Sequence, residues 1–299
     1  MTATLFLSLL FLALLLQGVL EPYRLVTDAV DGPVPGLPES WRGAKVVVLA
    51  DFQIGLWLDN RATTRRAVAR AVATRPALVL LAGDFVHDTA RGIGPVAELL
   101  RPLAAAGIPA YAVLGNHDYG MPTERHKPDR ELAGALTRAL QEVGVRVLCN
   151  ESVLLTNERG DTLYLVGLDS SLPTGSDDPE RAFAAVPDGA PRIALMHHPD
   201  TYAKIPAHAA PLSFAGHTHG GQVRLPFAAG QSLLTRFRDG RRYDEDWAHR
   251  HGSPGNRLYV TRGVGCSVLP VRLNCPPEFT LLTLMRPEEA EGVPLSSAH

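Results

Sequence analysis

Five stretches of the sequence place metal-binding side chains at the end of a short apolar run. Each run has the length of a β-strand and stops at aspartate, asparagine or histidine, in most cases just after a glycine. The runs are VVVLAD, ending at Asp51; LVLLAGD, ending at Asp84; YAVLGNHD, reaching Asn116, His117 and Asp118; IALMHH, reaching His197; and LSFAGHTH, ending at His217 and His219. Their carboxylate, amide and imidazole groups suit Mn²⁺, Fe, Zn²⁺ or Mg²⁺ rather than a sulfur-rich structural site.

Two aspartates, one asparagine and three histidines make six ligands, which is more than one tetrahedral ion can use. Two divalent metal ions about 3.5–4 Å apart, bridged by a shared carboxylate, would use them all. Such a pair stabilises both the attacking and the leaving oxygen of a phosphoryl displacement. The ligand set therefore predicts metal-assisted phosphoester hydrolysis.

The elements between the runs explain how these side chains could meet. Helical segments, NRATTRRAVARAVAT and GPVAELLRPLAAAG, separate the first three runs, which is typical of parallel crossovers. Uninterrupted apolar strands indicate a sheet buried on both faces, and ligands of such sheets bind beyond the carboxyl ends of the strands. One polar cluster of this kind is more typical of a turn or a helix cap. Five at equivalent strand ends predict a single site.

The motifs resemble, in order, those of the calcineurin-like metallophosphoesterases. They are Asp51, GD at 83–84, GNHD at 115–118, His197 and GHTH at 216–219. HHPD at 197–200, GHTHGGQVRLP at 216–226 and YVTRGVGCSVLPVRLNCPPEFTLLTL at 259–284 resemble the bacterial membrane-associated branch of that superfamily. The resemblance covers about residues 44–285. It implies an α/β fold of four layers, an α/β/β/α sandwich in which two mixed sheets pack face to face with helices outside.

The resemblance also implies a role for each residue. Asp84 bridges the two metals, Asp51 and His219 bind the first, and Asn116, His197 and His217 bind the second. His117 contacts the scissile phosphate, where it stabilises charge or protonates the leaving oxygen. Asp118 orients the His117 imidazole, with a loop-capping role as an equal alternative. A metal-bound hydroxide attacks the phosphorus in line, so no protein nucleophile is needed.

The stretch DFQ, residues 51–53, departs from the family pattern, which usually has Asp-x-His there. If the strand stays extended, Gln53 faces the same way as Asp51 and its amide oxygen reaches the first metal as a neutral, weaker ligand. This would favour Mn²⁺ or Mg²⁺ over Zn²⁺. The alternative is that Gln53 turns away and water takes its place. In GDFVHD, His87 stands where relatives often carry aspartate.

The N-terminal residues predict a membrane anchor. Residues 3–20 carry no charge and, as a helix, match a bilayer core of about 30 Å. A cleaved signal peptide is the alternative, but no basic stretch precedes the run and no clear cleavage site follows it. The nearest basic residues, Arg24, Arg42 and Lys45, follow the run, which favours a cytoplasmic catalytic domain. We expect an anchor at 1–22, a Pro/Gly-rich linker at 23–43, a catalytic domain at 44–286 and a polar tail at 287–299.

Composition limits the partners. Lysine and arginine number 29 against 31 aspartate and glutamate, so no nucleic-acid binding is indicated, and no protein partner is predicted. The three cysteines form neither a disulfide framework nor a zinc motif.

An anchored site suggests a phospholipid-like or nucleotide-lipid substrate, and part of the branch resembles UDP-2,3-diacylglucosamine pyrophosphatases of lipid A synthesis. The alternatives are a phosphomonoesterase, a phosphoprotein phosphatase, or a membrane-anchored metal-binding protein whose catalysis is impaired at Gln53.

Overall fold

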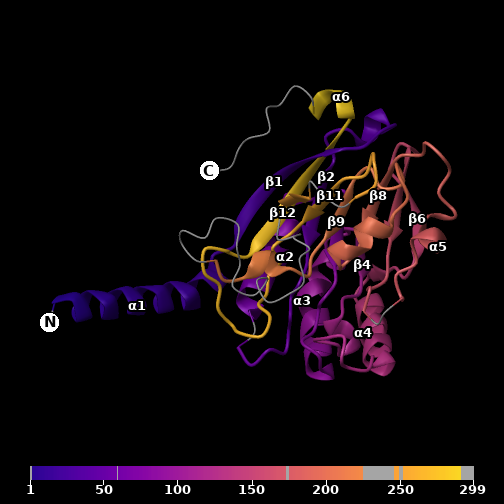
Figure 1. Cartoon of the computed structure of the whole chain (residues 1–299). Helices are drawn as coiled ribbons and strands as arrows, with labels where there is room; N and C mark the ends of the chain where they lie inside the picture. The colour runs from indigo at the N-terminus through magenta and orange to yellow at the C-terminus, as the bar shows by residue number, and fades with distance from the viewer. Residues whose placement is uncertain (1, 59, 173–174, 225–245, 249–251, 291–299) are drawn as a thin grey trace.

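The computed structural model describes residues 2–58, 60–172, 175–224, 246–248 and 252–290 of the 299 (Figure 1). Two six-stranded sheets pack face to face, and helices cover the outer faces. Alternation along single strands explains the layers: Val46 and Val48 face the second sheet, whereas Val47 and Leu49 face the helices. A third apolar cluster lies on the outer face of the second sheet. The expected four-layer sandwich is therefore confirmed.

The first sheet has the order β1-β12-β2-β3-β4-β5. Its central strands β2, β3 and β4 run parallel, as the alternation of apolar runs with helical segments predicts. Strand β12 is antiparallel to β2 and parallel to β1, so the sheet is mixed. The strands are β1 (Val26–Pro33), β2 (Lys45–Leu49), β3 (Leu78–Ala82), β4 (Ala110–Val113), β5 (Val145–Val147) and β12 (Glu278–Met285).

The second sheet has the order β10-β11-β9-β8-β7-β6 and is mixed as well. Strands β7, β8, β9 and β11 run parallel, and antiparallel strands close both edges. The strands are β6 (Glu151–Thr156), β7 (Thr162–Gly167), β8 (Arg192–Leu195), β9 (Ser213–Ala215), β10 (Asp246–Ala248) and β11 (Leu258–Val260).

Three helices cover the outer face of the first sheet: α2 (Arg61–Thr74), α3 (Ile93–Ala105) and α4 (Arg130–Glu142). Each buries a stripe of apolar residues, such as Leu132, Leu136 and Leu140 of α4, at the spacing expected for an amphipathic helix. The layer outside the second sheet is thinner and contains α5 (Pro179–Phe183) and the 3₁₀ turn η5 (Pro199–Lys204).

The segment 23–43 differs from the expected linker. Its residues 26–33 form β1, which pairs along its whole length with β12. The glycine and proline content suggested a linker, but Gly32 and Pro33 end a strand here, and β1 is the edge strand where proline is tolerated. The expected tail begins with α6 (Pro287–Ala290), and its residues 291–299 lie outside the described part of the chain.

Helix α1 (Thr2–Leu20) projects from the body, as Figure 1 shows. By length and composition it could cross a membrane, and only a small share of it is buried against the protein. A 3₁₀ turn, η1 (Glu21–Tyr23), joins it to the folded body.

Candidate metal centre

The carboxyl ends of β2, β3, β4, β8 and β9 bring the predicted ligand residues together. Asp51, Asp84 and His219 offer three ligand atoms that all lie within 4.8 Å of one another. His219 Nε2 lies 3.4 Å from Asp51 Oδ1, and the backbone N–H of His217 donates to both oxygens of Asp51. These residues come from three loops that are far apart in the sequence, so the fold itself assembles the group.

A second group lies on the other side of Asp84. Oδ2 of Asp84 is 3.2 Å from His197 Nε2, and that nitrogen is 3.3 Å from Nδ1 of His217. The other ring nitrogen of His197, Nδ1, donates to the carbonyl of Ala82 at 2.7 Å. This bond orients the ring and leaves Nε2 facing the group, which is the usual arrangement for a metal-binding histidine.

Two buried side-chain atoms, one of Asn116 and one of His219, have lone pairs that could bind a metal ion. Asn116 donates from Nδ2 to the carbonyl of Met121 at 2.7 Å, which fixes the amide and leaves its buried Oδ1 without a hydrogen-bond partner. His219 Nδ1 is also buried without one. Buried polar atoms are rarely left unsatisfied, and a bound ion is a recognised explanation. The oxygen and nitrogen ligands present therefore suit a hard or borderline divalent cation.

Burial and charge set the protonation of the site. Burial, aided by the Asp84 charge, raises the pKa of Asp51 to about 7. Burial would also raise the pKa of Asp84, but the charges of His197 and His117 hold it below its ordinary value. Burial opposes charge on His197, yet the adjacent Asp84 raises its pKa to about 9. In the metal-free protein at neutral pH, a proton on His197 balances the Asp84 charge.

A metal ion must displace that proton before His197 Nε2 can bind it. Because the pKa of His197 is raised to about 9 and that of Asp51 to about 7, apparent metal affinity is expected to rise with pH through this range. Calorimetric titration with Mn²⁺ at pH 7, in two buffers of different ionisation enthalpy, should show proton release. A His208→Asn variant, altered at an exposed histidine away from the group, should release the same number of protons. Binding without proton release would contradict the prediction.

The backbone around the centre is unusual. Asp51, Asp84, His217 and His219 all have positive φ, between 52° and 73°. Non-glycine residues adopt this region at a cost of order 1–3 kcal/mol each, and such residues cluster at functional sites. Packing is also close: a Cβ atom on Gly115 would lie 2.1 Å from Asp84 Oδ1. Only glycine at 115 leaves the Asp84 carboxylate in place.

His117 lies beside the metal-binding groups. Its backbone N–H donates to Asp84 Oδ1 at 3.0 Å, and its Nε2 lies 4.0 Å from Asp84 Oδ2. Its Nδ1 is 2.9 Å from Oδ1 of Asp88, and its ring stacks on that of His87, with centroids 5.1 Å apart. Burial opposes the charged ring, but Asp84 and the hydrogen bond with Asp88 outweigh it and raise the pKa of His117.

Of the two expected roles of Asp118, the hydrogen bonds favour loop capping. Its carboxylate accepts hydrogen bonds from four backbone N–H groups, at distances of 2.8–3.1 Å, in the loops that carry Asp84 and Asn116. Asp118 therefore caps these loops. The carboxylate beside the His117 ring is that of Asp88. The sequence analysis missed Asp88, although it follows His87 directly in GDFVHD.

Gln53 differs from the expectation, because β2 ends at Leu49 and Gln53 itself has φ 51°, so the backbone is not extended there. Its Nε2 donates to Asp84 Oδ2 at 2.9 Å, and its Oε1 lies 2.7 Å from His87 Nδ1. The side chain thus reaches the centre with its nitrogen. Rotating the amide by a half turn would put the oxygen beside Asp84.

Replacement of Gln53 tests whether that rotation occurs. Gln53→His is expected to raise Zn²⁺ or Fe occupancy, because imidazole binds these ions better than a neutral amide oxygen. Gln53→Ala should lower occupancy. Metal content after equilibration with a Mn²⁺ and Zn²⁺ mixture measures both, and Gln141→His on exposed α4 is the control. Wild-type metal content and preference in both variants would show that Gln53 is no ligand.

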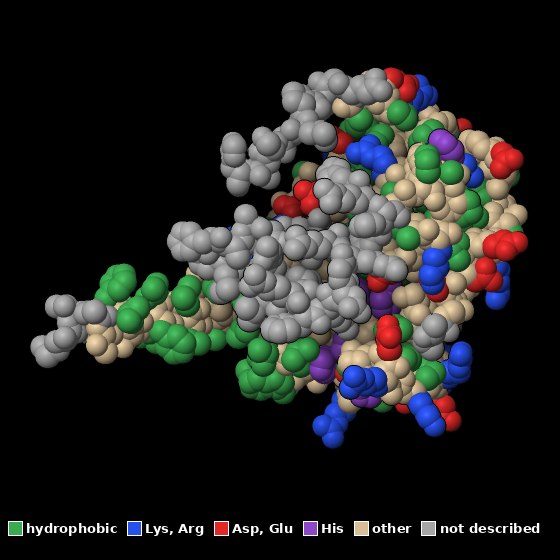
Figure 2. All heavy atoms as spheres, viewed as in Figure 1, with side chains coloured by type: hydrophobic (Ala, Val, Ile, Leu, Met, Phe, Trp, Pro, Cys, Tyr) green, Lys and Arg blue, Asp and Glu red, His purple; other side chains and the backbone are tan. Residues whose placement is uncertain are grey.

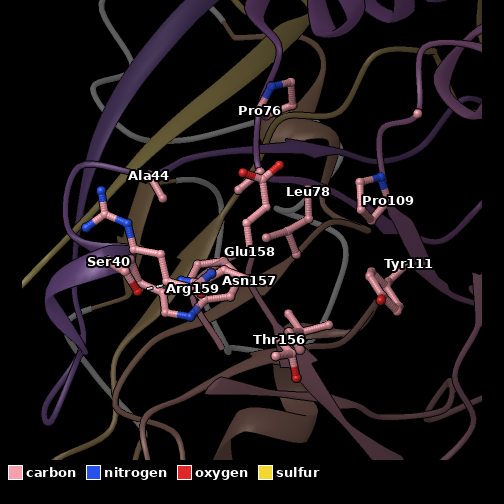
Figure 3. A pocket seen from close by; sticks show the side chains of 14 residues that line it. Ser40, Ala44, Pro76, Leu78, Pro109, Tyr111, Thr156, Asn157, Glu158 and Arg159 are labelled. Carbon is pink, nitrogen blue, oxygen red and sulfur yellow. Dashed lines mark hydrogen bonds between the residues drawn. The ribbon is translucent and has the colours of Figure 1, made fainter. Parts of the chain in front are cut away.

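A separate cavity of about 510 Å³ lies at the opposite ends of the strands (Figure 3). Its lining includes Ala44, Leu78 and Pro109, which precede or begin β2, β3 and β4. The metal-binding residues follow the carboxyl ends of the same strands, and none of them lines this cavity. The cavity is therefore not part of the candidate centre.

Comparison with known proteins agrees with this site. Residues 44–227 match the family described as calcineurin-like phosphoesterase. The chain is 32% identical over 243 residues to phosphodiesterase YaeI of Escherichia coli (strain K12), which covers 81% of this chain and 82% of that protein. It is 28% identical over 291 residues to a transmembrane protein with metallophosphoesterase domain from Danio rerio, covering 91% and 62%.

A further relative is the UDP-2,3-diacylglucosamine pyrophosphatase LpxG of Chlamydia muridarum (strain MoPn / Nigg). It is 25% identical over 304 residues, covering 88% of this chain and 90% of that protein. The match to the family spans more than half of the sequence and contains all five motif positions. The chain belongs to the calcineurin-like phosphoesterase family of metal-dependent hydrolases.

Proposed function

We propose that the protein is a membrane-anchored phosphodiesterase or pyrophosphatase with two divalent metal ions, acting on a lipid-linked phosphoester. The observation that carries the proposal is the position of Asp84. Its carboxylate belongs to one group with Asp51 and His219 and lies 3.2 Å from His197 of the other. A single carboxylate between two ligand groups is the arrangement that a dinuclear centre requires.

The residues divide between the two groups. Asp51 and His219 would hold the first ion, Asn116, His197 and His217 the second, and Asp84 both. When bound, the ions would supply an activated water and stabilise charge on the phosphoryl oxygens. The mixture of oxygen and imidazole ligands supports two divalent ions of the Mn²⁺, Fe, Zn²⁺ or Mg²⁺ type.

His117 would act on the phosphoester from beside the ions. Its hydrogen bond with Asp88 and its stacking on His87 fix the imidazole plane. The raised pKa of His117 favours the protonated ring. We infer that the ring donates a hydrogen bond to a phosphoryl oxygen or a proton to the leaving oxygen.

The substrate class is supported by α1 and by the relatives. An apolar helix that could cross a membrane supports a substrate class in which the centre would act close to lipid. One relative is named for a nucleotide-lipid substrate and another as a transmembrane protein. The basic residues that follow α1 favour a cytoplasmic catalytic domain.

Hydrolysis of bis-p-nitrophenyl phosphate tests the reaction. The full-length protein in detergent is expected to hydrolyse it with Mn²⁺ and to lose activity after dialysis against EDTA, because the activated water depends on the ions. Activity that survives prolonged chelation would contradict the proposal. A protein that binds two metal equivalents but hydrolyses neither this diester nor p-nitrophenyl phosphate would favour the impaired metal-binding alternative.

A further inference from the structure

Exposed apolar side chains of the body gather beside the end of α1. After α1, six large apolar residues of the described chain are strongly exposed, and five of them lie in three neighbouring segments. Trp57 is 70% exposed and Val268 66%. Figure 2 shows hydrophobic side chains along α1 and on the body at its base, next to histidine side chains. The five residues are Tyr23, Trp57, Leu58, Val268 and Leu269.

The three segments form one continuous surface. A hollow of about 240 Å³ lies between them, lined by Val19 and Tyr23 at the end of α1, by Trp57 and Leu58, and by Leu269. An apolar patch of this kind on a folded domain marks an interaction surface. We use the term interface patch for the five exposed residues together with this hollow.

Contacts on several sides fix the end of α1 and the η1 turn that follows it to the body. The N–H of Arg272 donates to the carbonyl of Gly18 at 3.0 Å, and the N–H of Cys275 donates to Glu21 Oε1 at 2.7 Å. On the other side, Thr63 Oγ1 donates to the carbonyl of Pro22 at 2.9 Å. The direction of the helix relative to the interface patch is therefore set by the fold.

This geometry places the interface patch at the level of a bilayer surface. A helix of 19 residues is about 28 Å long, close to the thickness of the hydrocarbon core. The end of α1 would then lie at the boundary with water, the region that Trp and Tyr prefer. Arg24, which follows η1, and Arg61 and Arg65 of α2 are exposed and complement anionic headgroups.

The interface patch is built on the same loops as the metal centre. Trp57 and Leu58 follow Asp51 in the loop after β2. The other loop is tied to the centre by Gly265, whose N–H donates to the Asp51 carbonyl at 2.7 Å. The buried guanidinium of Arg272 joins these parts, because it donates to the carbonyls of Gly265 and His219. These hydrogen bonds join the patch to the ligand loops.

We propose that the interface patch rests in the lipid interface of the bilayer that α1 enters and holds the metal centre at headgroup level. The inference rests on the proposed anchoring by α1. It deepens the proposed function, since a phosphate at headgroup level belongs to an amphipathic phosphoester that reaches the site from the membrane.

Fluorescence quenching tests the position of Trp57. The full-length protein is reconstituted in vesicles of phosphatidylcholine and phosphatidylglycerol, with lipids brominated at shallow acyl positions as the quencher. We expect most of the quenching to be lost in Trp57→Phe, because Trp41 is 5% exposed and Trp247 is partly buried on β10, at the edge of the second sheet. Equal fractional quenching in wild type and Trp57→Phe would overturn the inference. Failure of the wild type to enter vesicles would instead overturn the anchoring itself.

Turnover of two reporters tests the consequence for the substrate. Two activities are compared: that on a vesicle-borne long-chain alkyl p-nitrophenyl phosphate and that on soluble bis-p-nitrophenyl phosphate. Leu269→Glu is expected to lower the ratio of the first to the second by about tenfold, because one leucine side chain is no longer buried in the membrane. The matched control is Leu154→Glu, since Leu154 is also 52% exposed but lies on β6, away from α1. Equal ratios in both variants would overturn the inference. A wild type inactive on both reporters would overturn the proposed function, and the quenching result would still decide the position of the patch.

Discussion

Asp84→Asn is expected to lower kcat by about 10³-fold or more and to remove at least one metal equivalent. The carboxylate lies between the two ligand groups, 3.2 Å from His197 Nε2. Asparagine keeps the shape but loses the charge and one of the two oxygens. Losing metal stabilisation of the transition state costs several kcal/mol, which corresponds to this decrease in rate. Metal content and turnover of bis-p-nitrophenyl phosphate measure the effect.

Asp188→Asn is the matched control for the loss of one aspartate charge, because Asp188 is exposed in a loop away from the centre. It should keep wild-type metal content and turnover. Circular dichroism of Asp84→Asn separates a local effect from unfolding. A folded Asp84→Asn protein with two metal equivalents and activity within tenfold of the wild type would contradict a bridging role.

His117→Ala is expected to lower kcat by about 10²–10⁴-fold while both metal equivalents remain. The ring lies beside Asp84 without belonging to either group that contains the predicted ligands. If the ring protonates the leaving oxygen, the loss should be smaller for p-nitrophenyl esters, whose leaving group needs little protonation, than for alkyl esters. Loss of one metal equivalent would instead identify His117 as a ligand.

Asp88 should act through His117 as a positioning residue. Asp88→Asn is expected to lower kcat with little change in KM or metal content, because the imidazole loses the carboxylate 2.9 Å from its Nδ1. In the double variant with His117→Ala, the Asp88 substitution should have no further effect. Additive losses would show that Asp88 acts independently of the ring.

The sequence predicts most reliably where apolar runs are continuous. Strands β2, β3 and β4 are buried on both faces, so each appears in the sequence as an uninterrupted apolar run. The runs ending at Asp51, Asp84 and Asn116 therefore predict where these strands end. Strand β1 was missed for a physical reason. Its segment, VTDAVDGP, alternates exposed and buried residues, and it is extended because β12 lies beside it. Pairing with a strand so distant in the sequence leaves no local signal.

At the metal centre, residue types were predictable but side-chain directions were not. The prediction for Gln53 assumed an extended backbone, whereas positive φ at Asp51 and Gln53 turns the chain. For Asp118 the sequence left two roles open, at the His117 ring or capping a loop, and its four backbone hydrogen bonds satisfy a fully buried carboxylate in the second. Both outcomes depend on loop conformation, which periodicity does not encode.

The place of β12 between β1 and β2 has a consequence for the timing of synthesis. A ribosome releases α1 and β1 early, yet β1 has no hydrogen-bonded neighbour in the sheet until residues 278–285 have emerged. The loop that carries Gly265 to the Asp51 carbonyl also emerges late. While the nascent chain waits, α1 can already enter the bilayer. With the proposed anchoring, insertion would precede completion of the catalytic domain, and a truncated polypeptide without β12 would reach the membrane without an assembled hydrolytic site.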